Sequence, residues 1–289
     1  MTITLVRTRI IISAKRGIKN NIPTMKDNQE YYAGVDIGSA FIKAVLINQK
    51  QIVSYEILSS RGHYKETARK VLDQVLNKGR FRFDMLSGIV VTGIGAESAP
   101  FQARQFSEIS CQAAGCRSLF SSARIVIDIG GQFTRAVKLT PQGRVANFLM
   151  SEKCATGSGR FLQVIARILR INVEEIGPLS LKSQSPVEFS TNCAVFAESE
   201  TISRIAEGAR MEDILAGVHR ALAAKAAVLV KRLGMEQDVV LTGGGGEDSG
   251  LVSAVSEALE VDVLVPEQPR LTAALGAAIL AKEENDKTH

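Results

Sequence analysis

The sequence has 289 residues, of which 45% are hydrophobic and 22% charged, a balance typical of a soluble, globular chain of one large or two moderate domains. It has no Trp and few aromatic residues, which argues against nucleic-acid recognition by base stacking, and it has no apolar run long enough to cross a bilayer. The formal net charge is +5. The first 26 residues hold six bases and no acid, whereas the rest of the chain holds 29 bases and 30 acids and is nearly neutral.

Residues 1–30 are predicted to form a basic, disordered tail outside the fold. Whether this tail is genuine stays open at this point, because Met25 is an alternative start. We expect a first lobe over 31–124 and a second lobe over 125–289. The last helix of the second lobe can pack back on the first lobe. Four cysteines are too few for a disulfide framework in a chain of this length, so we expect a cytoplasmic protein.

Hydrophobic alternation and helical periodicity predict the elements of the first lobe in chain order. They are strands at 32–38, 42–47 and 51–58, a helix at 65–79, a strand at 87–92 that ends in a Gly-Ile-Gly turn, and a short helix at 108–115. The first two strands are joined by a tight turn, so they form a β-hairpin that presents Asp36 just ahead of the turn.

The opening pattern recurs about ninety residues later. A strand at 124–129 carries Asp128 and ends in Gly130-Gly131, and strands at 134–139 and 144–150 follow it. Internal duplication of this kind indicates two similar lobes, each beginning with a hairpin that presents an Asp and a Gly-rich turn.

The remainder of the second lobe is predicted to be mostly helical. The elements are a helix at 158–171, a loop-like stretch with a short turn at 172–186, helices at 193–208 and 211–233, a buried strand at 238–242, a helix at 251–259, a strand at 262–265 and a helix at 271–282.

The two Asp-Gly turns share the same arrangement of residues, an Asp followed two positions later by glycine. They combine Asp36 with Gly38 and Ser39, and Asp128 with Gly130 and Gly131. Backbone N–H groups of such a turn can face phosphate oxygens, and glycine lets the backbone approach closely. Each Asp can hold Mg²⁺ through water, because Mg²⁺ keeps several waters and takes few carboxylates. One such turn is a weak signal, but two inside matching hairpins indicate a nucleotide-phosphate site.

Three further features bear on this site, each with a plain structural alternative. The run Gly243, Gly244 and Gly245 follows a buried strand and suits close contact with the adenosine side of a nucleotide, or is a flexible turn. Lys43 either points at phosphate or is a solvated strand lysine. Gln132 either positions the attacking water or is a turn residue.

Two cysteines, Cys154 and Cys193, lie about forty residues apart, each at the head of a predicted helix. Free N–H groups and the helix dipole stabilise a thiolate there, which suits a metal ligand or a reactive thiol. The alternative is that both are small buried hydrophobes. We treat Cys111 and Cys116 as buried or incidental thiols, and His63 and His219 as surface residues.

The order of two phosphate loops, an adenosine loop and a small-residue helix over residues 31–284 resembles the actin-like ATPase superfamily of sugar kinases, Hsp70 chaperones and actin. The stretches Lys153-Cys154-Ala155-Thr156-Gly157-Ser158-Gly159-Arg160-Phe161 and Cys193-Ala194-Val195-Phe196-Ala197-Glu198-Ser199-Glu200 narrow this match. They resemble signatures of the BadF/BadG/BcrA/BcrD-type ATPases, which include activators of (R)-2-hydroxyacyl-CoA dehydratases and ATP-binding subunits of benzoyl-CoA reductase.

The resemblance implies an α/β chain with the actin-like (ribonuclease H-like) fold: two duplicated lobes around a nucleotide cleft, and a helix-cluster-helix element. It implies ATP and Mg²⁺ bound between Asp36 and Asp128, and a [4Fe-4S] cluster shared by two subunits, each giving Cys154 and Cys193. The electron donor would be ferredoxin or flavodoxin. The acceptor would be a CoA-thioester reductase or dehydratase, with a homodimer or a homologous ATPase subunit completing the cluster.

Several positions depart from the family pattern. Ser39 lies where a Thr-rich run is common, Gln112 where His is frequent, and Glu247-Asp248 where a basic or amide pair is usual. The variant Thr156-Gly157-Ser158-Gly159 favours the reductase subunit over the dehydratase activator, but the sequence does not separate the two. It also leaves the acyl-CoA substrate and the choice between homo- and hetero-oligomer open.

Two other classes of function compete with this interpretation. A small-molecule kinase of the same superfamily needs a carboxylate base beside its substrate hydroxyl, and no such motif is evident. A scaffold or filament protein with an actin-like fold needs neither cysteine. Neither class explains residues 153–161 and 193–200 together.

Overall fold

The computed structural model describes residues 29–49, 51–151, 158–189 and 194–287. Contacts divide these residues into two compact units. The first unit contains 29–123, 139–146 and 270–287, and the second contains 124–138 and 147–269, apart from the gaps just given. None of the described helices combines the length and apolar character that a bilayer crossing requires.

The first unit is built on a mixed five-stranded sheet in the order β3-β2-β1-β4-β5. Its strands are β1 (Tyr31–Ile37), β2 (Phe41–Asn48), β3 (Ile52–Ser59), β4 (Gly88–Thr92) and β5 (Arg104–Gln105). β2 pairs antiparallel with β1 and with β3, whereas β4 runs parallel to β1 and β5 parallel to β4. The four longer strands confirm the predicted ones to within two residues, and β5 was not predicted.

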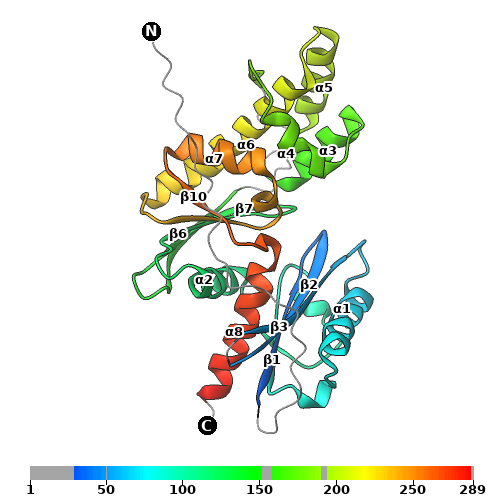
Figure 1. The fold of residues 1–289 in the computed structure, drawn as a ribbon, viewed down its shortest axis with the longest axis vertical. Coiled ribbons are helices and arrows are strands. Elements are labelled where there is room, and N and C mark those ends of the chain that lie inside the picture. The colour runs from blue at the N-terminus through cyan, green and yellow to red at the C-terminus, as the bar shows by residue number, and fades with distance from the viewer. Residues whose placement is uncertain (1–28, 50, 152–157, 190–193, 288–289) are drawn as a thin grey trace. The chain divides into compact units, whose positions relative to one another are not determined.

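Helices cover both faces of this sheet (Figure 1). Because side chains alternate along a strand, Ala33 and Val35 of β1 pack under α1 (Tyr64–Gly79). Tyr32, between them, faces the other side, which α8 (Thr272–Asp286) covers. The helix α2 (Glu108–Leu119) packs against α8. The last helix of the chain therefore belongs to the sheet formed by its first strands.

Glycines allow α8 to approach its neighbours at backbone distance. A Cβ atom on Gly276 would lie 1.7 Å from the carbonyl oxygen of Cys111 in α2, and one on Gly115 would lie 2.0 Å from that of Thr272. On the sheet side, a Cβ on Gly34 of β1 would lie 2.0 Å from the Ala274 carbonyl oxygen. Real Cβ atoms do not come this close, so the small residues of the predicted last helix are needed for packing.

The second unit repeats the plan with a five-stranded sheet in the order β10-β9-β6-β7-β8. Its strands are β6 (Ile125–Ile129), β7 (Thr134–Leu139), β8 (Val145–Met150), β9 (Val239–Thr242) and β10 (Val263–Leu264). β6 pairs antiparallel with β7 and parallel with β9, as β1 does with β2 and β4. The duplication predicted from sequence is thus confirmed in strand order and direction.

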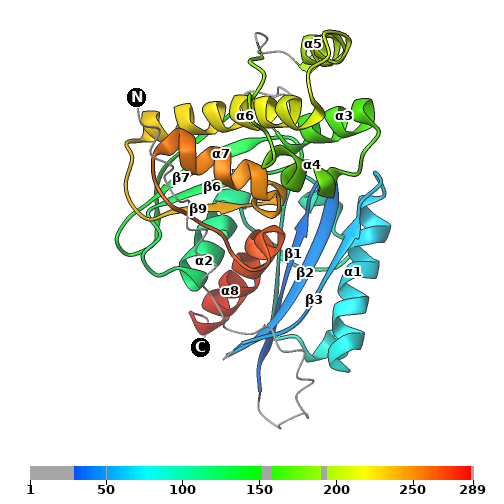
Figure 2. The same ribbon diagram turned by 45° about the horizontal axis from the view of Figure 1, so that its top comes forward.

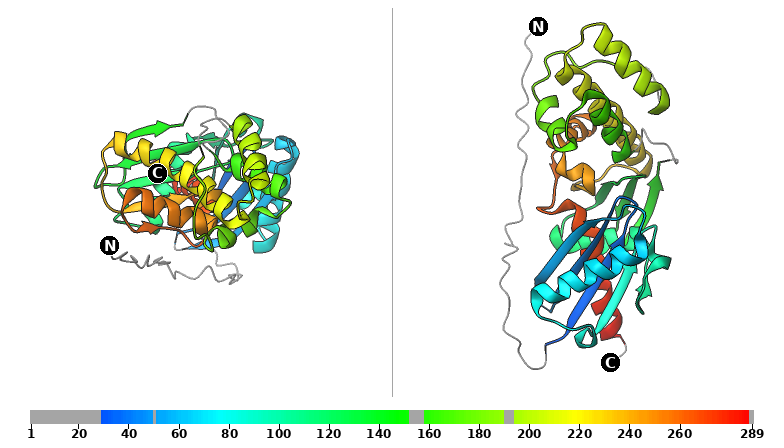
Figure 3. Two further views of the ribbon diagram at one scale, coloured as in Figure 1. Left: turned by 90° about the horizontal axis from the view of Figure 1, so that it is seen from above. Right: turned by 90° about the vertical axis from the view of Figure 1, so that its right-hand side faces the viewer.

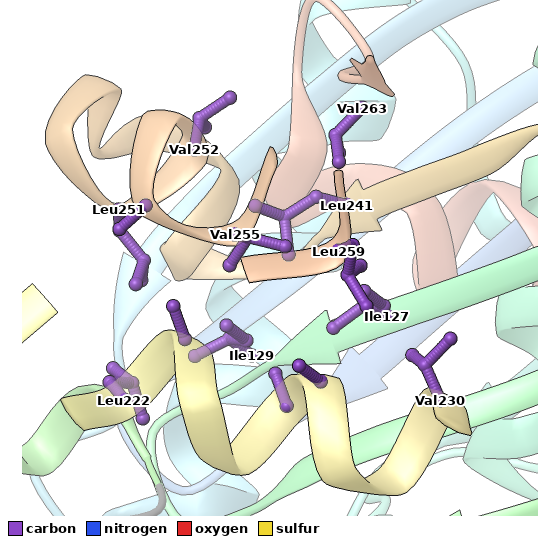
Figure 4. Close-up of a cluster of buried hydrophobic side chains, with 14 of the residues drawn as sticks. Ile127, Ile129, Leu222, Val230, Leu241, Leu251, Val252, Val255, Leu259 and Val263 are labelled. Carbon is purple, nitrogen blue, oxygen red and sulfur yellow. The ribbon is translucent and has the colours of Figure 1, made fainter. Parts of the chain in front are cut away.

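Helices α6 (Met211–Leu233) and α7 (Ser249–Leu259) lie along one face of this second sheet (Figure 2). The core between them is aliphatic, and Figure 4 shows its centre: Ile127, Ile129, Leu222, Val230, Leu241, Leu251, Val255 and Leu259. Helices α3 (Gly159–Leu169) and α5 (Ala194–Ala206) lie beside each other in the same unit (Figure 3). All four were predicted as helices.

The prediction of a loop-like stretch at 172–186 was wrong. Residues Val173–Ser180 form the helix α4. Its start is marked by Asn172, whose backbone N–H donates to the Glu175 carboxylate at 2.8 Å, as in a capping box. The Asn-x-x-Glu spacing was a usable signal, but Pro178, inside the helix, obscured the helical pattern.

We predict that Gly276→Ala destabilises the first unit by about 3 kcal/mol, because the new methyl group would force α8 away from α2 and over-packing outweighs the helix propensity of Ala. Chemical denaturation followed by circular dichroism measures this. Glu283→Ala, on the exposed face of the same helix, is the matched control and should change stability little. Equal effects of the two substitutions would contradict the packing argument.

Candidate functional site

The first Asp-Gly turn closes the β1–β2 hairpin. The backbone N–H of Gly38 donates to the Phe41 carbonyl oxygen at 3.1 Å, and the strand ladder begins only at the Ile37–Ile42 pair. The N–H groups of Ser39 and Ala40 therefore lie outside the ladder, at the tip of the turn. Turns of this kind suit anion binding, because their N–H groups point away from the sheet.

Asp36, two residues before this turn, is a buried carboxylate bound to a buried cation. Its Oδ2 atom lies 2.6 Å from Nζ of Lys43, its cross-strand partner in the hairpin register. The Lys43 side chain is 14% exposed, so it is not a solvated strand lysine. A Cβ on Gly38 would lie 3.0 Å from the same Nζ, which places the ammonium beside the turn.

The second Asp-Gly turn repeats this geometry at the end of β6. The N–H of Gly130 donates to the Phe133 carbonyl oxygen at 2.9 Å, in the same place in the hairpin. Gly131 and Gln132 lie in the turn and are partly exposed. The Oδ2 atom of Asp128 accepts from Nη1 of Arg135 at 2.8 Å.

Arg135 is the functional residue that sequence reasoning missed. It stands seven residues after Asp128, as Lys43 stands seven after Asp36, and both are cross-strand partners of the Asp. The side chains of Arg135 and Asp128 are only 10% and 5% exposed. The repeated spacing was the available signal, because an antiparallel hairpin with a fixed turn places the same two positions opposite each other.

The third glycine loop also has a counterpart in the first unit. Thr92 of β4 lies beside Asp36, and Thr242 of β9 beside Asp128, and each threonine is followed by a glycine with positive φ. A Cβ on Gly93 would lie 2.6 Å from Asp36 Oδ1, and a Cβ on Gly243 would lie 2.5 Å from Asp128 Oδ1. Both positions therefore need glycine for φ and for space.

The loop after Gly243 turns at once into a short 3-10 helix, Gly244–Glu247. Gly244 is exposed, whereas Gly245 is buried with its Cα against Ile129 of β6. In the second unit, the structure thus brings together Asp128, Gly130, Gly131, Gln132 and the loop from Gly243 to Gly245.

The donor set fits a hydrated magnesium ion. The Oδ1 atom of Asp36 is buried and has no hydrogen-bond partner among the described residues, although its Oδ2 is bound to Lys43. An orphaned carboxylate oxygen beside a turn rich in N–H groups is the kind of acceptor that a water of a hydrated Mg²⁺ can use.

The predicted cluster ligands Cys154 and Cys193 lie outside the described residues, but the chain on both sides of Cys154 is anchored to the second hairpin. The N–H of Ser151 donates to the Thr134 carbonyl oxygen at 2.8 Å. After the gap, the N–H of Gly159, the first residue of α3, donates to the Gly130 carbonyl oxygen at 2.8 Å. The Cys154 segment therefore begins and ends on the hairpin that carries Asp128.

The approach to Cys193 is held by α6. Oδ1 of Asp213 accepts hydrogen bonds from Ser183 Oγ and from the N–H groups of Gln184 and Ser185. These bonds, first of all the one from Ser183, hold the pKa of the Asp213 carboxyl below its usual value. The α5 helix then begins at Ala194, directly after Cys193.

The side chains of Cys111 and Cys116 are fully buried, in agreement with prediction. Burial raises the pKa of Cys111 to about 12, so its thiol stays protonated at neutral pH and is a poor cluster ligand. Among the residues that the structure describes, no three His, Cys, Asp or Glu side chains gather as a metal site.

The prediction that His219 is a surface residue was wrong, whereas His63 is exposed as expected. The side chain of His219 is 2% exposed and bonds to Ser180 and Asp248. A lone histidine inside the long predicted helix gave no sign of these partners, because they come from α4 and from the loop before α7.

We predict that Arg135→Gln lowers the free energy of unfolding by about 3 kcal/mol, because it leaves the buried Asp128 carboxylate without its cation. The double variant with Asp128→Asn should recover much of this loss, since no charge is then left unpaired. Denaturant titration of both variants tests the coupling. Arg82→Gln is the control, because Arg82 and Asp84 form an ion pair with side chains 72% and 65% exposed, and it should be nearly neutral. Additive losses in the double variant would contradict the coupling.

Known proteins share the sequence and the fold of this chain. The chain is 42% identical over 255 residues to the 2-hydroxyisocaproyl-CoA dehydratase activator of Clostridioides difficile, covering 88% of this chain and 96% of the relative. The structure of that activator with bound ADPNP superposes with a TM-score of 0.85 at 41% identity, over 89% of this chain and 96% of the other. A benzoyl-CoA reductase subunit of Thauera aromatica is 31% identical over 267 residues, covering 88% of this chain and 94% of the relative.

The fold is therefore the predicted actin-like ATPase fold, shared with these activators. The profile of the BadF/BadG/BcrA/BcrD ATPase family matches residues 33–281, and the chain belongs to this family of ATPases.

Proposed function

We propose that the chain is an ATP-hydrolysing, iron–sulfur electron-transfer component that activates a 2-hydroxyacyl-CoA dehydratase. The observation that carries the proposal is the hydrogen bond from Gly159 N–H to the Gly130 carbonyl oxygen at 2.8 Å. It joins a loop with phosphate-binding chemistry to the first turn of the helix that follows Cys154. A change at the loop therefore reaches the cysteine segment through one backbone contact.

In this proposal both Asp-Gly turns bind phosphate oxygens of ATP. Asp36 and Asp128 orient waters of Mg²⁺, and Gln132 positions the attacking water. The N–H groups of Ser39 and Gly131 face phosphate oxygens, and Lys43 adds a positive charge beside the first turn. Gly38 and Gly130, whose own N–H groups close the turns, let the phosphates approach the backbone closely. Gly243, Gly244 and Gly245 bind the adenosine side. The buried ion pairs at both Asp residues support these roles, because they fix each carboxylate before ATP arrives.

Cys154 and Cys193 are the residues that would hold the cluster. Two thiolates are half of the set that a [4Fe-4S] cluster needs, so a second copy of the chain, or a homologous ATPase subunit, would supply the others. Such a cluster supplies one-electron transfer at a potential set by its exposure and hydrogen bonding. The protein's part is to hold both cysteine segments, through Gly159 and Ser151 for the first and Asp213 for the second. Ferredoxin or flavodoxin would be the electron donor.

The identities favour an activator over a reductase subunit. Named dehydratase activators match at 42%, 40% and 36% identity, against 31% for the benzoyl-CoA reductase subunit. The partner would accordingly be a CoA-thioester dehydratase, in place of the reductase that the Thr156-to-Gly159 variant had favoured.

Asp36→Asn and Asp128→Asn should each lower kcat/KM for ATP hydrolysis by about a hundredfold, because removing one preorganised charged group costs that much in comparable sites. Phosphate release by the full-length, anaerobically prepared chain measures this, with circular dichroism to verify folding. Asp84→Asn, on an exposed carboxylate, is the matched control. Hydrolysis at the wild-type rate in either loop variant would exclude the proposed role of that Asp.

Cys154→Ala and Cys193→Ala should each abolish bound iron and the EPR signal of the reduced cluster. The double variant Cys111→Ala, Cys116→Ala should keep both, since these buried thiols are not ligands. Iron analysis after anaerobic reconstitution compares the three. A wild-type chain without iron, or a cluster that survives loss of Cys154, would contradict the proposal.

A further inference from the structure

Two buried polar side chains and one partly buried carboxylate form a chain of hydrogen bonds in the second unit, away from both Asp-Gly turns in sequence. Nδ1 of His219 lies 2.9 Å from Ser180 Oγ, and its Nε2 lies 3.1 Å from Asp248 Oδ2. Ser180 is the last residue of α4, His219 lies in α6, and Asp248 is the N-cap of α7. The proposed ATP chemistry uses none of them.

The donor and the acceptor can be assigned at the Asp248 end of this chain. Ser180 Oγ lies within hydrogen-bond distance of both the Gly177 carbonyl oxygen, at 2.9 Å, and His219 Nδ1. Asp248 Oδ2 is a carboxylate oxygen, so it accepts from His219 Nε2. Its other oxygen, Oδ1, accepts from Leu251 N–H at 2.9 Å and caps α7. The ring therefore donates from Nε2 to Asp248 at the start of α7, and its Nδ1 faces the Ser180 hydroxyl of α4.

Two glycines make room for these side chains. A Cβ on Gly250 would lie 2.0 Å from Ser180 Oγ and 2.7 Å from His219 Nδ1. A Cβ on Gly177 would lie 2.6 Å from Asp248 Oδ1. Glycine at both positions lets α4, α6 and α7 come close enough for one imidazole ring to bridge them.

Asp248 connects this chain of hydrogen bonds to the glycine loop. Asp248 directly follows the 3-10 helix Gly244–Glu247, so its side chain fixes the end of the glycine loop. The start of the same loop is fixed by Gly243, whose N–H donates to the Pro269 carbonyl oxygen at 3.0 Å and whose Cα lies against Asp128. Between Gly243 and Asp248, Gly245 and Gly246 are buried, and Gly244 and Glu247 are exposed.

We propose that His219 is a positioning residue of the nucleotide site: by holding Asp248 to α4 and α6, it sets the glycine loop for the nucleoside end of ATP. The inference rests on the proposed function, in which this loop binds the adenosine side. It predicts that the His219 contacts contribute to binding of the nucleoside and not of the phosphates, because neither Asp-Gly turn touches them.

Two substitutions of His219 separate its two hydrogen bonds. His219→Gln can keep a donor at the place of Nε2 and so retain Asp248, whereas His219→Asn is one methylene shorter and reaches only toward Ser180. We expect His219→Asn to raise the ATP dissociation constant and KM about tenfold, which is the weight of one lost hydrogen bond to a charged group. His219→Gln should stay within about threefold of wild type in both quantities, and kcat should be unchanged in both variants.

The measurement is calorimetry with Mg-ATP and with Mg-tripolyphosphate on the full-length, anaerobically prepared chain. Tripolyphosphate lacks the nucleoside, so its affinity should be the same in all variants. Arg124→Gln is the structural control, because its ion pair with Glu236 lies at the opposite end of β6 from the Asp128 turn. This control should lower stability without changing either affinity.

Equal loss of ATP and tripolyphosphate binding in His219→Asn would overturn the inference, as would unchanged ATP binding in that variant. Should His219→Asn not fold, His219→Leu takes its place, since leucine fills the space of the ring and removes the hydrogen bond to Asp248. It should also weaken ATP alone, and equal weakening would again overturn the inference. A wild-type chain that binds tripolyphosphate but not ATP refutes the adenosine role directly, whereas one that binds neither refutes the proposed function itself.

Discussion

The buried ion pair at the end of the first strand in each unit is the constraint on which the rest of the site depends. A carboxylate that is about one-twentieth exposed is strongly destabilised unless a cation compensates it. The antiparallel hairpin provides that cation seven residues later, as Lys43 for Asp36 and as Arg135 for Asp128. The other oxygen of each carboxylate lies against the glycine that ends the parallel neighbour strand, Gly93 or Gly243, where no side chain fits.

From this centre, backbone contacts lead to the segments that carry the cysteines. Gly159 N–H is bound to the Asp128 turn, and Ser151 is bound to the strand that follows the turn. Because both ends of the Cys154 segment rest on one hairpin, a displacement of that hairpin changes the direction in which α3 starts. The Cys193 segment is held differently, through Asp213 at the start of α6. The two cysteine segments therefore have separate supports.

The long helix α6 connects these supports with the glycine loop. Asp213 in its first turn holds the chain that precedes Cys193, and His219, less than two turns later, holds Asp248 at the end of the glycine loop. The same histidine bonds to Ser180 of α4, which follows α3 after a short link. The helix α6, buried along most of its length, thus bonds to the chain before Cys193, to α4 and to the residue that ends the glycine loop.

The sequence by itself determined the strands, the duplication, the Asp-Gly turns and most helices, because these follow from local periodicity and turn chemistry. Its family signature around the two cysteines was also sufficient to identify the BadF/BadG/BcrA/BcrD ATPases. The helix α4 was not predicted, because Pro178 interrupts its short apolar pattern and the helix packs against α3, α6 and α7, which are distant in the sequence or unknown to a local pattern. The tertiary structure alone decided that Arg135 neutralises Asp128, that Gly93 matches Gly243, and that His219 is buried between Ser180 and Asp248. These relations join residues 7 to 39 positions apart, or occur in both units, and they depend on strand register and helix packing. The repeated seven-residue spacing hinted at the first of them, but the partners of His219 had no such signal.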